Sequence, residues 1–332
     1  MRILSRAVNL TLAVFLSQLG PAVAKPTFSQ EPNKKDNVAG TDSEPIVLTV
    51  TVTNDDGEPV TGLRKDQFIV FDNKIAQKLV YFSDGDLPIS VGILFDVSAS
   101  VKGTQESGAQ RLAIIKNALS RFLQMSNSAN EYFLIGFNQR PQLLQDWTTD
   151  SSILLEKVSA LQLKGNTAFY DACYLAIDKI RSGHFSRRAL IVISDGEDNV
   201  SNYTFAGVKR LLKESNASFY SINVLPTLPP GYTMSSWALG EGGDVLVELS
   251  SISGGMTFLP NEKEANAAFE RIAEVLHHQY LIGFNSNSSG QRQAHQIKVK
   301  LSLPLSHPHE KRHLIIRFRQ TVRDENESLQ VC

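Results

Sequence analysis

Five oxygen-bearing side chains occur in an order and spacing that can hold a divalent cation. Asp96, Ser98 and Ser100 alternate in the segment FDVSASV, and alternate residues of an extended turn can point the same way. Thr167 stands in KGNTAFYDA, and Asp195 ends the apolar run ALIVISD. Carboxylate and hydroxyl oxygens, without histidine or thiolate, suit a hard cation such as Mg²⁺, with Mn²⁺ or Ca²⁺ as alternatives. We therefore expect a metal site with an open position for water or a partner's oxygen.

Three of these residues also have a purely structural interpretation. Ser98 and Ser100 can cap the N-terminus of a helix, and Asp195 can form a turn before Gly196. A lone D-x-S-x-S pattern is a weak signal because serine is common. The metal interpretation is favoured because all five positions agree with the predicted elements, and because an unpaired carboxylate after an apolar strand is costly unless it is solvated or coordinated. The two acidic residues after Gly196 are expected to be solvated.

The elements that must position these residues alternate between strands and helices. Residues 87–278 contain near-continuous apolar strands, and helical apolar spacing separates them. Such strands predict a mostly parallel sheet covered on both faces, which is a doubly wound, Rossmann-like α/β domain. Ligands bind such sheets at the carboxyl ends of the strands, where Asp96 and Asp195 fall. The strands are ISVGILFDVS, YFLIGF, LLQDWT, RALIVISDG, SFYSINVL and MTFLP; the helices are Arg111 to Met125, SSILLEKVSALQ after Asp150 as N-cap, AFYDACYLAIDKIRS, FAGVKRLLKES and Glu262 to His278.

Strand patterns without helices flank this domain on both sides. Residues 45–86 contain IVLTVTVTN, QFIVFDN and KLVYFSD, and residues 279–321 contain YLIGFN, HQIKVKLSLP and HLIIRFRQ. Neither set has enough strands to be stable alone. Pairing the two sets makes a small β-sandwich-like module from both ends of the chain, with the α/β domain inserted in it. We call these two ranges the β module.

The two ends of the chain have distinct compositions. Residues 1–24 carry Arg2 and Arg6, a short apolar run and the cleavage signal Ala22-Val23-Ala24, which predict a signal peptide and export to the periplasm or the medium. That run is too short to span a bilayer, and no later apolar stretch is long enough. Residues 25–44 are polar and predict a flexible leader, and residues 322–332 predict a tail.

The motif and its setting resemble the von Willebrand factor A-type (VWA) domain, whose metal ion-dependent adhesion site has the form D-x-S-x-S, then Thr, then Asp. Residues 87–278 would form that domain. The segments TVTNDDGEPVTGLRKDQFIVFDN, DVSAS, NTAFYDA, SDGEDN, QYLIGFN and IKVKL look like the bacterial VWFA-related family first described in acidobacteria, over nearly the whole mature chain. The polar ending RFRQTVRDENESLQVC departs from that family's pattern.

The resemblance implies a role for each residue of the site. Asp96 would anchor it, Ser98 and Ser100 would ligate directly, and Thr167 and Asp195 would ligate directly or through water. An Asp or Glu carboxylate of a protein partner would take the open position. The resemblance thus implies an exported adhesion-type module that binds proteins through its metal ion. The alternative is a structural or assembly subunit that uses the same domain as a constitutive docking scaffold.

Composition and missing motifs exclude several other functions. Lys plus Arg (33) nearly cancels Asp plus Glu (34), so no field draws the chain to nucleic acid or an anionic membrane. The chain lacks G-x-S-x-G, P-loop and G-x-G-x-x-G motifs, and its one H-E-x-x-H match, at residues 309–313, falls in or beside a polar turn where we expect surface residues. We therefore expect no enzymatic activity. His277 and His278 are expected to meet terminal helix carbonyls, with a second metal site as the alternative. Cys173 is expected to be a buried thiol, and Cys332 is terminal, so no disulfide framework is predicted.

Overall fold

The computed structural model describes residues 45–98, 105–223, 241–260, 264–285, 294–303 and 313–323. The predicted signal peptide and leader (1–24 and 25–44), Ser100 and Cys332 lie outside this part of the chain. No helix among the described residues combines the length and apolar character that a membrane span requires.

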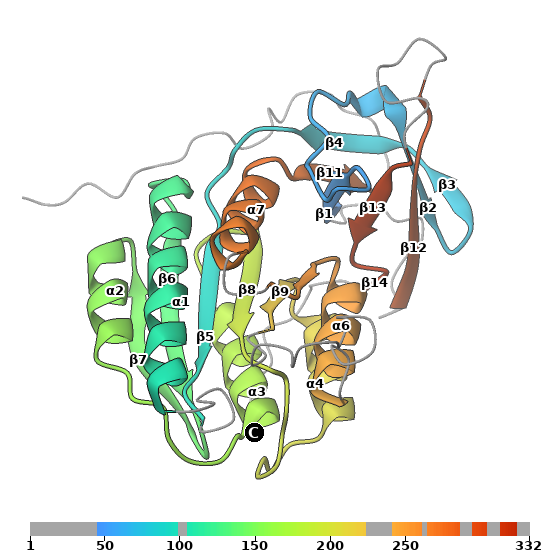
Figure 1. Cartoon of the computed structure of the whole chain (residues 1–332). Helices are drawn as coiled ribbons and strands as arrows, with labels where there is room; N and C mark the ends of the chain where they lie inside the picture. The colour runs from blue at the N-terminus through green and yellow to red at the C-terminus, as the bar shows by residue number, and fades with distance from the viewer. Residues whose placement is uncertain are drawn as a thin grey trace, which may run out of the picture. The chain divides into compact units, whose positions relative to one another are not determined.

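A six-stranded sheet forms the centre of the α/β domain, in the order β10-β9-β8-β5-β6-β7 (Figure 1). All neighbours pair in parallel except β7, which pairs antiparallel with β6 at one edge. The predicted doubly wound, mostly parallel sheet is therefore confirmed. The strands are β5 (Ser90–Asp96), β6 (Glu131–Phe137), β7 (Pro141–Thr148), β8 (Arg188–Ile193), β9 (Ser218–Ile222) and β10 (Thr257–Phe258).

Among the described residues, three helices cover each face of this sheet (Figure 1). Because side chains of a strand alternate between the faces, Phe95 packs with one set of helices and its neighbour Leu94 with the other. One set is α1 (Gln105–Met125), α2 (Ser151–Ser159) and α7 (Ala265–His277). The other set is α3 (Phe169–Ile180), α4 (Phe205–Glu214) and α6 (Glu241–Ser253).

The helix boundaries agree with the sequence at some ends and differ at others. Asp150 caps α2 as predicted, since its Oδ1 accepts a hydrogen bond of 2.9 Å from the Ser152 amide. The helix predicted to begin at Arg111 begins at Gln105. The sequence analysis missed its first residues because they are mostly polar and carry no apolar periodicity. Cys173 is fully buried and free, as expected.

In the described residues, the β module consists of two four-stranded sheets with strands from both ends of the chain. One has the order β13-β1-β11-β4 and the other β14-β12-β2-β3. Val50 of β1, Val70 of β2 and Val299 of β12 share one apolar core between the sheets. The strands are β1 (Ile46–Thr53), β2 (Phe68–Asp72), β3 (Ile75–Gln77), β4 (Leu79–Ser83), β11 (Tyr280–Phe284), β12 (Ala294–Leu301), β13 (Ile315–Phe318) and β14 (Thr321–Arg323), with a 3-10 turn at Lys65–Gln67.

The predicted tail of residues 322–332 begins two residues too early. Thr321 to Arg323 forms β14, which pairs with β12, so the β module continues past residue 321. A three-residue strand bordered by polar residues has no pattern that the sequence alone reveals. The other predicted boundaries of the leader, the β module and the α/β domain stay predictions.

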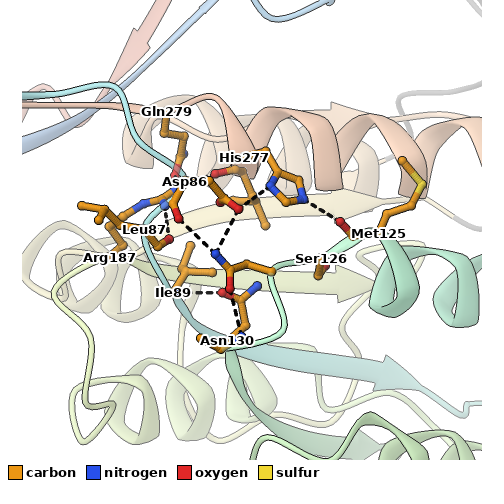
Figure 2. A network of polar contacts seen from close by, with 12 residues as sticks. Asp86, Leu87, Ile89, Met125, Ser126, Asn130, Arg187, His277 and Gln279 are labelled. Atoms are coloured by element: carbon orange, nitrogen blue, oxygen red, sulfur yellow. Dashed lines mark hydrogen bonds and ion pairs between the residues drawn. The ribbon is translucent and has the colours of Figure 1, made fainter. Parts of the chain in front are cut away.

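A polar network closes the amino end of the central sheet, away from Asp96 and Asp195. The guanidinium of Arg187 donates to the carbonyl oxygens of Leu87 and Leu276, and over 2.9 Å to Oε1 of Gln279 (Figure 2). Burial lowers the pKa of Arg187. The amide of Gln279 continues the network by donating to the hydroxyl of Tyr220 over 3.0 Å.

His277 joins α7 to its neighbours in the same region (Figure 2). Its Nδ1 lies 2.8 Å from Oδ2 of Asp86, and its Nε2 lies 2.5 Å from the carbonyl oxygen of Met125. The imidazole therefore bonds to the end of α1 and to the segment before β5, rather than to the terminal carbonyls of its own helix.

Candidate metal centre

Asp96 is the last residue of β5 and is almost fully buried, with 1% of its surface exposed. Its Oδ1 accepts a hydrogen bond of 2.8 Å from the amide of Ser98, and its Oδ2 accepts one of 2.6 Å from the hydroxyl of Ser194. The Ser98 hydroxyl also bonds to this carboxyl group. These bonds fix the carboxyl group of Asp96 at the carboxyl edge of the sheet.

Asp195 lies beside Asp96 because of the register between two neighbouring strands. β5 and β8 run parallel, with Phe95 opposite Ile193, so the residues after them meet at the same edge. Asp195 is buried, and its Oδ1 accepts a hydrogen bond of 3.1 Å from the Glu197 amide.

Ser194 is a member of the site that the sequence analysis missed. Its hydroxyl donates to Asp96 and accepts a hydrogen bond of 3.0 Å from the Gly196 amide. The sequence does place a hydroxyl residue directly before Asp195. The register that puts it opposite Asp96 is known only from the strand order.

Thr167 is held between the two aspartate loops by main-chain contacts. Its amide donates to Oδ1 of Asn199 over 3.0 Å, and its carbonyl oxygen accepts from the Asn199 amide over 3.0 Å. On the other side, the amide of Lys164 donates to the carbonyl oxygen of Val97 over 2.7 Å. Thr167 is buried, with 1% of its surface exposed, so its loop is an integral part of this edge of the domain.

The loop after Asp195 also caps helix α3. The residue before the helix, Ala168, has no side chain that can accept a hydrogen bond from the first amides of the helix. Side chains of the loop after Asp195 accept these hydrogen bonds instead. Oδ1 of Asp198 accepts from the Tyr170 amide over 3.1 Å, and the hydroxyl of Ser201 accepts from the Asp171 amide over 3.0 Å. Asp198, which was expected to be a solvated acid, is therefore a structural residue that joins two of the predicted ligand loops.

Two glycines let the backbone of helix α6 approach this loop. Gly196 has a φ of +80°, a left-handed conformation that favours glycine, and a Cβ there would lie 2.2 Å from the carbonyl oxygen of Gly242. A Cβ on Gly242 would in turn lie 2.6 Å from the carbonyl oxygen of Asp195. The main chain after Asp195 is therefore fixed by direct contact with the start of α6.

The electrostatics of the site favour a bound cation. The pKa of Asp96 is raised to about 6, chiefly by burial and also by the negative charge of Asp195, while hydrogen bonds from Ser194 and Ser98 act against this shift. No Lys, Arg or His among the described residues forms an ion pair with either aspartate. Two buried carboxyl groups without a compensating positive charge, next to hydroxyl groups, fit a hard divalent cation.

A site of this composition differs from one built only of acidic, histidine or cysteine ligands. Within the described ranges, no group of three or more His, Cys, Asp or Glu side chains is placed to hold a metal ion. The structure brings Asp96, Ser98 and Asp195 together and connects the Thr167 loop to them, whereas Ser100 lies outside the described residues. Coordination by these five residues stays a prediction.

The candidate residues lie at the carboxyl edge of the central sheet of an α/β domain. Residues 91–197 match the family model of the von Willebrand factor type A domain. Residues 91–197 are therefore similar to a VWA domain, as the resemblance implied.

Relatives and solved structures share this similarity at low identity. An uncharacterized protein of Borreliella burgdorferi is 21% identical over 198 residues, which cover 56% of this chain and 57% of that protein. The chain thus spans little more than half the length of this curated relative.

Two solved structures are similar to parts of the chain. The vWF domain of the type V pili tip protein Mfa5 from Porphyromonas gingivalis is 15% identical, with 57% of this chain and 95% of that chain covered and a TM-score of 0.45. A von Willebrand factor type A protein from Catenulispora acidiphila is 11% identical, with 86% and 74% covered and a TM-score of 0.43.

Proposed function

We propose that this chain is an exported module that binds a protein partner through a divalent cation, Mg²⁺ or alternatively Mn²⁺ or Ca²⁺. Its ligands would be Asp96, Ser98, Ser100, Thr167 and Asp195, and an Asp or Glu of the partner would complete the coordination. One observation carries the proposal: Asp96 and Asp195 lie together, buried, at the carboxyl edge of the sheet without a cationic partner among the described residues.

The residues of the chain would each contribute through their present contacts. A bound cation would offset the two buried negative charges and attract a carboxylate. Ser194 holds the carboxyl group of Asp96 in orientation, and the burial of Thr167 limits access of water to that side of the centre. Asn199 keeps the Thr167 loop against the loop of Asp195.

A structural or assembly subunit is the second candidate. It is favoured by the hydrogen bonds among the three ligand loops, because an ion there would also fasten the loops to one another. In that case the domain would dock constitutively, and the ion would support the fold instead of the contact. We propose binding and not catalysis in both cases.

The decisive experiment is capture of partners from the exported fraction with the purified protein, with and without EDTA. Binding through the ion predicts that partner capture is lost with EDTA and with Asp96→Ala, while circular dichroism shows an intact fold. Capture that is indifferent to both changes would contradict the proposal. For a structural ion, the melting temperature falls sharply on chelation, yet any assembly persists as long as the domain is folded.

Export rests on the pattern of residues 1–24 alone, and it has its own test. The mature protein from the producing cells should begin at Lys25, after cleavage behind Ala24. N-terminal sequencing of that protein measures this directly. A mature chain that still begins at Met1 would overturn the proposed export.

A further inference from the structure

A cleft opens beside the predicted metal centre, between the start of β7 and the end of α2. Its volume is about 260 Å³, and its apolar lining includes Phe137, Leu144 and Leu161. Val97, which lies within the D-x-S-x-S segment, is also part of the lining. The cleft therefore borders the segment that carries Asp96 and Ser98, and a partner bound at the ion would lie next to it.

The charged residues that line this cleft within the described part of the chain are both basic. They are Arg140 and Lys164, and both are exposed. Neither side chain forms an ion pair with another residue of the described ranges. Their positive charges are therefore free to meet a negative group of a partner.

The backbone that carries these two residues is fixed to the metal centre. The Lys164 amide donates to the carbonyl oxygen of Val97, and the side chain of Asn138 donates to the carbonyl oxygen of Lys164 over 3.1 Å. The backbone carbonyl oxygen of Asn138 accepts a hydrogen bond of 2.6 Å from the amide of Ala168. The cleft thus keeps its position relative to the residues that would hold the ion.

The opposite flank of the centre has the opposite charge. It is formed by the loop after Asp195 and the start of α3, where Asp171, Glu197 and Asp198 lie. Negative groups of a partner would be repelled from this flank and attracted to the basic flank. The charge distribution therefore selects one direction for an acidic segment that crosses the centre.

We infer that the partner segment carries two acidic side chains, one completing the ion's coordination and the other binding Arg140 and Lys164, with an apolar side chain between them in the cleft. This inference rests on the proposed function. It adds the class of ligand, which is an acidic peptide segment with an apolar residue, as expected for an apolar cleft with a basic rim.

Labelled synthetic peptides test this inference by fluorescence anisotropy in Mg²⁺. One carries Asp-Leu-Glu within a Gly-Ser background, and the other carries Asp-Leu-Gln at the same place. The first should bind about three- to tenfold more tightly, because exposed ion pairs contribute modest free energies. That advantage should shrink as salt is raised.

A charge-matched pair of variants identifies the surface. Arg140→Gln/Lys164→Gln should remove the advantage of the two-acid peptide while its melting temperature stays that of the wild type. The control variant Arg210→Gln/Lys213→Gln removes two exposed charges from α4. It should keep the affinity advantage of the two-acid peptide.

The remaining outcomes separate this inference from the proposed function. Equal Mg²⁺-dependent affinity for both peptides, or an advantage that survives in Arg140→Gln/Lys164→Gln, would overturn the acidic-segment inference and leave binding through the ion intact. Affinity of both peptides that does not respond to EDTA would count against the proposed function and, with it, against this inference.

Discussion

The hydroxyl of Ser194 donates a hydrogen bond of 2.6 Å to Oδ2 of Asp96, across two neighbouring strands of the central sheet. Its oxygen also accepts from the amide of Gly196, so one side chain connects the buried carboxyl group to the loop of Asp195. Ser194 is therefore placed to set the orientation of a predicted ligand without being one itself. Groups in such positions strongly affect metal affinity.

Replacing this hydroxyl should weaken metal binding more than it weakens the fold. Ser194→Ala should reduce Mg²⁺ affinity about tenfold or more, as is usual when an outer partner of a ligand is removed, and calorimetric titration measures it. Ser194→Thr keeps a hydroxyl and should recover most of the affinity. If both variants bind Mg²⁺ as the wild type does, the hydrogen bond to Asp96 has no part in the site.

The raised pKa of Asp96 predicts how the stability of the metal-free protein depends on pH. A carboxyl group with a folded-state pKa of about 6, above the ordinary aspartate pKa of 3.8, binds its proton more tightly in the folded state. Its stabilising contribution to the free energy of unfolding is fully present below about pH 4 and is lost as pH rises through about 6, a change of about 3 kcal/mol.

Urea unfolding in EDTA measures this effect when wild type and Asp96→Asn are compared. Asparagine does not titrate, so the difference in unfolding free energy between the two proteins should change in favour of the variant as pH rises across that range. A difference that is constant with pH would show that burial does not perturb Asp96.

Part of this structure could be predicted from the sequence because it depends on local patterns. Apolar runs such as Ser90–Asp96 and the helical spacing between them define a parallel sheet, and the strands at both ends of the chain predict the β module. The position of Asp96 and Asp195 at the carboxyl edge follows from the same reasoning. These features need no knowledge of which strands are neighbours.

The contacts that were missed depend on residues far apart in the chain. Ser194 meets Asp96 only because β8 lies next to β5, and Asp198 caps helix α3 through the amide of Tyr170, 28 residues before it. His277 bonds to the carbonyl oxygen of Met125, 152 residues away. Side-chain type identifies such groups as possible donors or acceptors, but strand order and loop conformation choose their partners.

Asp198 should contribute to stability through the helix that it caps. Asp198→Ala removes the acceptor for the Tyr170 amide and should lower the free energy of unfolding by about 1 kcal/mol, the usual effect of losing a cap. Because the same loop contacts Thr167 through Asn199, Mg²⁺ affinity should fall as well. Urea unfolding and calorimetry measure the two effects.

A pair of variants separates the cap from the charge at this position. Asp198→Asn keeps an oxygen acceptor and should retain most of the stability that Asp198→Ala loses. Glu197→Ala removes an exposed charge from the same loop and should leave unfolding nearly unchanged. Loss of stability in Glu197→Ala equal to that in Asp198→Ala would mean that charge in this loop matters and capping does not.

Gly196 should be the least replaceable residue of the loop, for two separable reasons. Its φ of +80° is unfavourable for a residue with a Cβ, and a Cβ there would lie 2.2 Å from the carbonyl oxygen of Gly242. Gly62 provides the matched control, since its φ is +75° and nothing lies within 4 Å of a Cβ built on it. Gly62→Ala should therefore cost about 1 kcal/mol from backbone strain alone, and Gly196→Ala more than about 3 kcal/mol, because backbone atoms must also move apart.

Thermal and urea unfolding of both variants measure the difference. Equal losses would show that α6 does not press on the loop of Asp195, and the contact that fixes this predicted ligand would have to be sought elsewhere.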